Sequence, residues 1–370
     1  VHIGNGGNDA ANGPVQGNIN ITIDGNLTMD AGLEDQAYAQ IGHGGHSQVN
    51  GVMTPAQPND INITTGGFID MNGSASGDPA SNISPQAYTQ IGHGGRGSRG
   101  GDGGATARER HGNITLTING ADGAGNALSL TGGASNESSV QVGHGGREAL
   151  GYNQGEITIN AAGNVALEGG GRSRSNALIG HGGDDSEKTN GVIGAGGVGT
   201  LEGNTGTIAI TTTNGGNLTL TGSQAPNGVG NDNVDSSAVV GHGGHLTFGN
   251  HSGDINLTLD GGLTLTGGVD ADNNSANDNN HAQIGHGGND ADGAHSGNIT
   301  ITANSDIIVQ GGVSGGNNYA QIGHGGDSTD GTKDGNISIT GEGALTVQGQ
   351  GGDGNSGQIG HGGRDSTGNI

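Results

Sequence analysis

Eight histidines occupy the same position of a repeated motif, and they are the side chains in this sequence whose type and spacing most readily suggest chemistry. The motif reads Gln-Ile-Gly-His-Gly-Gly with small variations, and successive copies lie 37 to 61 residues apart. Imidazole is a common ligand of zinc, copper and nickel. The candidate metal ligands are therefore His43, His93, His144, His181, His242, His286, His324 and His361.

A structural role competes with metal binding at these positions, and the sequence favours it. Strand parity places His43 on the same side as Ile41, facing inward. Copies stacked in register would lie about 4.8 Å apart, which suits a chain of neutral rings, each donating an N–H to the next, better than chelation. Two imidazolium charges at that distance would repel by roughly 3 kcal/mol at an effective dielectric constant near 20. We therefore expect a buried, neutral, metal-free ladder whose stabilising effect is lost as the pH falls below about 6.5.

The other polar residues of the repeat are expected to face solvent. Strand parity turns the motif glutamines away from the core, where stacked amides can form a surface ladder. Leu178 and Val239 interrupt this ladder. The histidines outside the motif, such as His46, His111 and His295, show no evident register and are predicted to be solvated. The glutamines of the predicted ladder are Gln40, Gln90, Gln141, Gln283, Gln321 and Gln358.

Acidic segments between the motifs offer carboxylate and carbonyl oxygens, the ligands that Ca²⁺ prefers. None matches an EF-hand loop or the nonapeptide calcium repeat, so solvated acidic turns are the favoured interpretation. The acidic residues change position from repeat to repeat, so no pair is singled out for glycoside hydrolysis. We predict no catalytic residue and no cofactor. The three acidic segments are 289–293, 184–185 and 327–331.

Composition limits the function further. The 370 residues include 87 glycines, no Trp, no Cys and only 28% hydrophobic residues, too little for an aromatic-rich globular core. The net charge of −25 disfavours nucleic acid and anionic lipid as partners. There is no apolar run of about 18 residues, so membrane insertion is not expected.

Three short strands per repeat must position these side chains. Ile19–Ile23 and Leu27–Met29 alternate aliphatic with polar residues, and Ala39–Ile41 leads into the motif; equivalent segments recur through the chain. Loop insertions occur only after the motif and before its lead-in strand. This pattern predicts an all-β fold, a right-handed parallel β-helix of three strands per rung and about eight rungs, with glycine at the corners. The alternative is an eight-bladed β-propeller, favoured by the hairpin-like Asp24-Gly25 and Asn119-Gly120.

The repeat style resembles a known class of protein. The string from Ala37 to Gly45, repeated less closely from Ala87 to Gly95, and the Gly-Asn-Ile-x-Ile and Leu-x-Leu-x-Gly-Gly blocks are similar to those of filamentous-haemagglutinin-type adhesins and autotransporter passengers. The resemblance implies export, an extracellular or cell-surface location, and a role in adhesion or fibre formation. We expect residues 1–370 to be one continuous array and a segment of a longer chain.

These observations lead to one functional hypothesis and two rivals. We expect a non-enzymatic extracellular rod that associates end to end with itself or with neighbouring repeats, and that contacts a cell-surface or polysaccharide target. The first rival is a β-helix carbohydrate-active enzyme with a groove beside the insertions at 184–207 and 223–237. The second is a metal-binding fibre built on the motif histidines.

Overall fold

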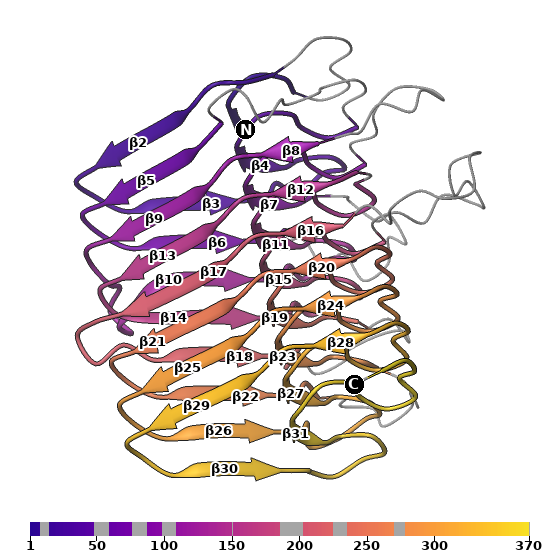
Figure 1. The fold of residues 1–370 in the computed structure, drawn as a ribbon. Coiled ribbons are helices and arrows are strands. Elements are labelled where there is room, and N and C mark those ends of the chain that lie inside the picture. Colours follow the sequence, from indigo (N-terminus) through magenta and orange to yellow (C-terminus); the bar gives the residue numbers. More distant parts are fainter. Residues whose placement is uncertain are drawn as a thin grey trace, which may run out of the picture.

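The repeats stack as the coils of a parallel β-solenoid, from the N-terminal end to the C-terminal end of the molecule (Figure 1). The computed structural model describes residues 1–7, 15–47, 59–75, 87–97, 109–149, 151–185, 203–224, 235–269 and 278–369. In these ranges each strand pairs in parallel with its equivalent in the next coil. The predicted β-solenoid is confirmed. The propeller is wrong, because the sheets run along the stack instead of forming separate blades.

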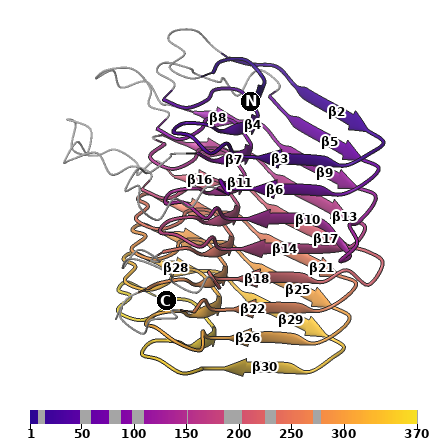
Figure 2. The ribbon, with the colours of Figure 1, turned by 180° about the vertical axis from the view of Figure 1, so that it is seen from behind.

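Two long sheets form the two wide faces of the coil, seen from opposite sides in Figures 1 and 2. The first sheet consists of β2 (Ile19–Ile23), β5 (Ile61–Thr65), β9 (Ile114–Ile118), β13 (Ile157–Ala161), β17 (Ile208–Thr212), β21 (Ile255–Leu259), β25 (Ile299–Ala303) and β29 (Ile337–Gly341). The second sheet consists of β3 (Leu27–Asp30), β6 (Ile69–Asn72), β10 (Asn126–Thr131), β14 (Asn164–Glu168), β18 (Leu218–Thr221), β22 (Leu263–Thr266), β26 (Ile307–Gln310) and β30 (Leu345–Gln348).

The lead-in strands of the motif build a third sheet, called the motif sheet below. Its members are β1 (His2–Ile3), β4 (Ala39–Ile41), β7 (Thr89–Ile91), β11 (Val140–Val142), β15 (Ala177–Ile179), β19 (Ala238–Val240), β23 (Ala282–Ile284), β27 (Ala320–Ile322) and β31 (Gly357–Ile359). All three predicted strands of the repeat are therefore present.

A fourth sheet, of two-residue strands, was not predicted. It precedes the first sheet in six of the coils, and its residues are polar, so no alternation of apolar residues marks it in the sequence. This short sheet consists of β8 (Arg110–His111), β12 (Asn153–Gln154), β16 (Asn204–Thr205), β20 (His251–Ser252), β24 (His295–Ser296) and β28 (Lys333–Asp334).

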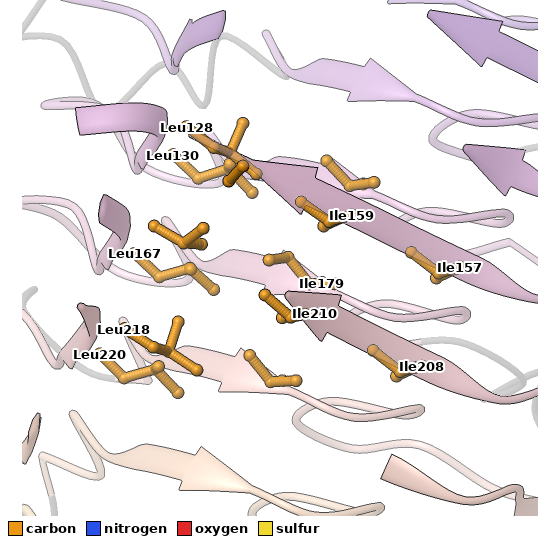
Figure 3. Packing of buried hydrophobic residues seen from close by; sticks show 14 of the residues in the cluster. Leu128, Leu130, Ile157, Ile159, Leu167, Ile179, Ile208, Ile210, Leu218 and Leu220 are labelled. Atoms are coloured by element: carbon orange, nitrogen blue, oxygen red, sulfur yellow. The ribbon is translucent and has the colours of Figure 1, made fainter. Parts of the chain in front are cut away.

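The core is a set of aliphatic columns that run along the stack. Ile159 pairs with Leu116 on one side and with Ile210 on the other, and all three are 0% exposed. Leu167 and Leu220 continue the same layer from the second sheet, and Ile179 closes it from the motif sheet (Figure 3). Each coil thus buries its few apolar side chains against copies of themselves, which removes their surface from water without any aromatic residue.

Glycine makes the close approach of successive coils possible at the motif corner. A Cβ added to Gly143 would lie 1.8 Å from the carbonyl oxygen of Gly180 in the next coil. Gly145 has a φ of 93°, a conformation that favours glycine. The Asp24-Gly25 and Asn119-Gly120 sites are also corners of the coil and not hairpin turns. The backbone hydrogen bonds beside them join successive coils: Gly66 N–H donates to Ile23 O, and Asn119 N–H donates to Thr65 O. In the described part of the chain no helix is long and apolar enough to cross a membrane.

Candidate functional site

The eight motif histidines form one continuous stack along the corner between the motif sheet and the short sheet. Neighbouring rings are nearly parallel, with centroids 4.7 to 5.0 Å apart. The seven from His43 to His324 are at most 3% exposed. The predicted inward-facing ladder, at the predicted spacing, is present.

Its hydrogen bonds differ from the prediction. The rings do not donate to one another. Each Nδ1 accepts the backbone N–H of the residue at the same motif position in the preceding coil, which is Asn5 for His43 and a histidine for the other seven, as in His144 N–H to His181 Nδ1 at 3.0 Å. Each Nε2 lies beside a carbonyl oxygen that precedes the first sheet, as in His181 Nε2 to Gly155 O at 2.8 Å. The rings stack face to face, so their edges point toward the backbone and not toward neighbouring rings.

These bonds fix one tautomer for every ring. A backbone N–H can only donate, so Nδ1 must be the acceptor and Nε2 must carry the proton that the carbonyl accepts. Both nitrogens are then occupied, and no lone pair remains for a metal. Among the residues that the structure describes, no group of three or more His, Asp or Glu side chains could hold a metal ion. The geometry therefore favours a structural role for the motif histidines.

Burial keeps the ladder neutral. Removing the imidazolium from water lowers the histidine pKa, and neighbouring ladder rings add like-charge repulsion, while the carbonyl at Nε2 opposes both effects. The lowered pKa values are about 3 for His93 and His242, about 4 for His181 and His324, and well below 6.5 for His144 and His286.

The predicted surface ladder of glutamines is wrong. The motif strands from β4 to β27 are buried along their whole length, and Gln90 is 1% exposed. Its Nε2 donates to the carbonyl oxygens of Gly143 (2.9 Å) and Gly145 (2.6 Å) in the next coil. Gln40, Gln141, Gln283 and Gln321 make equivalent bonds, so the amides satisfy glycine carbonyls of the corner and do not bond one another.

The prediction that the histidines outside the motif are solvated is wrong for His46, His111 and His295. His46 and His111 are 5% and 8% exposed, and His295 is fully buried. His251 and His295 stack on each other with centroids 5.2 Å apart. Burial lowers the pKa of His295 to about 4. His46 and His295 each belong to one of two further polar columns that were missed in the sequence.

The first missed column lies in the short sheet, behind the ladder. Asn153 Nδ2 donates to Asn204 Oδ1 at 2.6 Å, and Asn204 Nδ2 lies 3.1 Å from His251 Nδ1. At the C-terminal end Lys333, 1% exposed, donates from Nζ to the carbonyl oxygens of Thr329 and Thr367. Burial lowers the pKa of Lys333. The column comprises Arg110, Asn153, Asn204, His251, His295 and Lys333, always four residues before the first isoleucine of the coil.

The second missed column follows Gly-His-Gly-Gly directly, and we call it the post-motif column. Arg147 is 8% exposed and contacts the carboxylates of Glu137 (2.5 Å) and Asp184 (3.4 Å). Asp184 Oδ1 lies 2.9 Å from His245 Nδ1, and Asp235 lies 3.5 Å from Nε2 of the same ring. The column comprises His46, Arg96, Arg147, Asp184, His245, Asn289 and Asp327, and every member is buried. The sequence shows that these residues always directly follow the motif. They were not recognised as a column because the residue type changes from repeat to repeat.

Charge pairing sets the protonation of Asp184 and His245 within this column. Burial opposes charge on both Asp184 and His245, but their mutual hydrogen bond and attraction outweigh it. The pKa of Asp184 is therefore lowered and that of His245 raised. His245 has the opposite tendency to the ladder histidines only because carboxylates face both of its ring nitrogens.

The three acidic segments do not all lie in solvent. Asp184 and Asp327 are 4% and 5% exposed, so the prediction of solvated turns is wrong for these two residues. Asp185 contacts Arg147 (2.7 Å) and Arg174 (3.0 Å), which supply the positive charge that a calcium ion would bring. The insertions proposed to flank an enzymatic groove lie largely outside the described residues, which exclude 186–202 and 225–234.

The fold and its corner define a parallel β-solenoid repeat protein whose coils are joined by buried polar ladders. No family model matches the chain, and no curated protein or solved structure matches it either.

Proposed function

We propose that this chain is a stiff, acidic rod segment of a large bacterial surface protein, located outside the cell, where it serves adhesion or builds a fibre or coat. The observation that carries the proposal is the unbroken register of the motif sheet. Its nine strands pair in sequence order from β1 to β31. A chain in which every coil holds the next in this way is suited to spacing and bearing load along one axis.

The polar ladders support this function by stiffening the stack. Each motif histidine links two parts of the stack by hydrogen bonds. His181, for example, accepts the backbone N–H of His144 in the preceding coil and donates its Nε2 proton to Gly155 O, which precedes the first sheet. Gln141 adds bonds to Gly180 and Gly182 of the next coil. A buried polar group that loses its partner costs about 1–3 kcal/mol, so sliding or bending one coil against the next is opposed at the corner as well as in the core.

Charge and loops complete the proposed rod. The net charge of −25 opposes non-specific aggregation of such rods. The insertions of variable length after and before the motif would carry the contacts to a cell-surface or polysaccharide target, while ends of the stack would meet neighbouring repeats. The resemblance of the repeats to filamentous adhesins and autotransporter passengers is the basis for placing the rod outside the cell.

The shape of the purified chain tests the proposal. Nine strands at about 4.8 Å predict a stack about 40 Å long, measurable by small-angle scattering and electron microscopy. We expect rods of this length or linear multiples of it. A ring or a collapsed particle would contradict the rod. Cleavage of a polysaccharide panel, or stoichiometric metal by elemental analysis, would instead support the enzyme or the metal-binding fibre.

A further inference from the structure

The outward side of the first sheet carries no ionisable side chain on any of its eight strands. Its sixteen positions hold ten Thr, four Asn, one Ser and one Ala, all partly or fully exposed. A surface suited to a soluble protein has roughly a quarter to a third charged residues, so about four or five would be expected here. This threonine face consists of Asn20, Thr22, Asn62, Thr64, Thr115, Thr117, Thr158, Asn160, Ala209, Thr211, Asn256, Thr258, Thr300, Thr302, Ser338 and Thr340.

The charges near this face stand at its margins. Asp60, Glu156 and Asp254 directly precede strands of the first sheet, and three strands are directly followed by an acidic residue, namely Asp24, Asp260 and Glu342. The strands between these margins are in register, so the side chains form straight columns, as Thr211 and Thr258 do. The result is an uncharged strip along the rod, bordered by carboxylates.

The second sheet differs in this respect. Its outward positions include the carboxylates of Asp30, Asp70 and Glu168. Two sheets that pack face to face lie about 10 Å apart, and a carboxylate buried between them without a partner is strongly unfavourable. A flat surface could therefore cover the first sheet at lower electrostatic cost than the second.

We propose that the threonine face is a lateral docking surface for a second copy of this chain, so that two rods pack side by side through their first sheets. Two chains of net charge −25 repel each other, and this strip is where they can approach without placing carboxylates in opposition. Facing Thr and Asn columns can interdigitate as they do between paired sheets of stacked strands. A sugar polymer is a weaker fit, because the face offers no aromatic ring on which a sugar could pack.

The size of the face sets the strength of the contact. Eight strands at about 4.8 Å and five residues at about 3.3 Å give roughly 600 Å² per copy, or about 1,200 Å² in total. Specific interfaces begin near that area, so residues 1–370 should form a weak dimer. The contact area grows with each added coil, so longer arrays should associate more tightly.

Two double variants with the same charge test the proposal. T211E/T258E places two carboxylates on the threonine face, in β17 and β21. T219E/T264E places two on the second sheet, in β18 and β22 of the same coils. Each pair is adjacent in register, so the intramolecular repulsion is matched. Sedimentation velocity over a concentration series measures self-association, and circular dichroism and thermal melts verify that the solenoid is intact.

We expect the unmodified chain to dimerise, T211E/T258E to raise the dimer Kd at least tenfold, and T219E/T264E to change it less than threefold. A monomer at every concentration, or equal effects of the two variants, would overturn the lateral pairing. The lateral pairing would also be overturned if T211E/T258E lost binding to a neutral glucan but still dimerised like the unmodified chain. This proposal depends on the proposed rod only in requiring stacked coils. A solenoid that is intact but monomeric would therefore contradict the docking face and would not contradict the rod.

Discussion

At the scale of single residues, each motif imidazole is held at both ring nitrogens, and its chemistry is decided by that arrangement. His181 accepts the backbone N–H of His144 at Nδ1 and donates to Gly155 O at Nε2. Protonating Nδ1 would replace an acceptor by a second donor facing the same N–H, in a buried stack of like groups. His245 shows the contrast, since its two nitrogens face Asp184 and Asp235 and its pKa is raised.

The ladder predicts loss of stability in acid. The folded pKa values are about 3 for His93 and His242 and about 4 for His181 and His324, below the unfolded value of about 6.5, so the unfolded chain binds more protons between these limits. The stabilisation is complete above pH 6.5 and is lost as the pH falls toward the folded pKa. At pH 5 the loss should be about 2 kcal/mol for each of these four histidines. Urea unfolding at pH 7.5 and pH 5 measures it, and equal stability at the two pH values would contradict the neutral ladder.

The control is a substitution that the chain already contains. Asn5 takes the histidine position in the first coil, where its N–H donates to His43 Nδ1 and its side chain donates to Gln16 O at 3.2 Å. His181→Asn should therefore fold and should reduce the acid loss by the amount of one histidine. His245 acts in the opposite direction, because a raised pKa adds stability below about pH 6.5 that is lost as the pH rises through the folded value.

At the scale of elements, strands and corners depend on different properties of the sequence. The strands need only alternation, because inward aliphatic side chains such as Ile159 and Ile210 pack on their equivalents in adjacent coils. The corners need the absence of a side chain, because backbones of adjacent coils meet there. The high glycine content thus reflects close backbone approach at repeated sites and is compatible with an ordered fold.

Substitution at one corner glycine tests this explanation. Gly143→Ala would place a methyl group 1.8 Å from Gly180 O, and the atoms nearest to it are all backbone atoms of the next coil, which cannot turn aside as a side chain could. We expect unfolding free energy to fall by about 3 kcal/mol. Gly123→Ala is the matched control, because its added Cβ would meet no atom within 4 Å, and it should change stability by less than about 0.5 kcal/mol. Similar urea midpoints for the two variants would contradict the role assigned to the corner.

At the scale of the whole molecule, the chain combines strong net charge with buried ion pairs. The sequence has 35 acidic and 10 basic residues, and several of the basic ones are buried against carboxylates, as Arg147 is against Glu137 and Asp184. Other carboxylates of the described residues, such as Asp30, Glu168 and Asp260, are exposed along a stack whose coils are about 4.8 Å apart. They repel one another over many coils when the solution contains little salt.

Salt should therefore stabilise the solenoid. Raising ionic strength from 0.01 M to 0.15 M shortens the screening length from about 30 Å to about 8 Å, which removes repulsion between distant coils. We expect the melting temperature to rise by a few degrees, measured by circular dichroism. The destabilisation caused by Arg147→Met should be about the same in both buffers, because its buried ion pairs are screened far less. A melting temperature that falls with salt would show that surface attraction outweighs the repulsion.

Sequence patterns favoured the coil over the propeller, and the strand pairing of the structure decided between them. Alternating residues such as those of Ile114–Ile118, repeated with glycine-rich corners, can bury their aliphatic side only by stacking on their own copies. Parity also placed the motif histidines inside. Tertiary structure alone decided what lies over the other side of the motif strands. Gln90 faces away from the core as parity requires, yet it is buried because that side of the strand is covered too. Alternation predicts on which face of a strand a side chain lies. Its solvation, tautomer and hydrogen-bond partners depend on the part of the chain that covers that face.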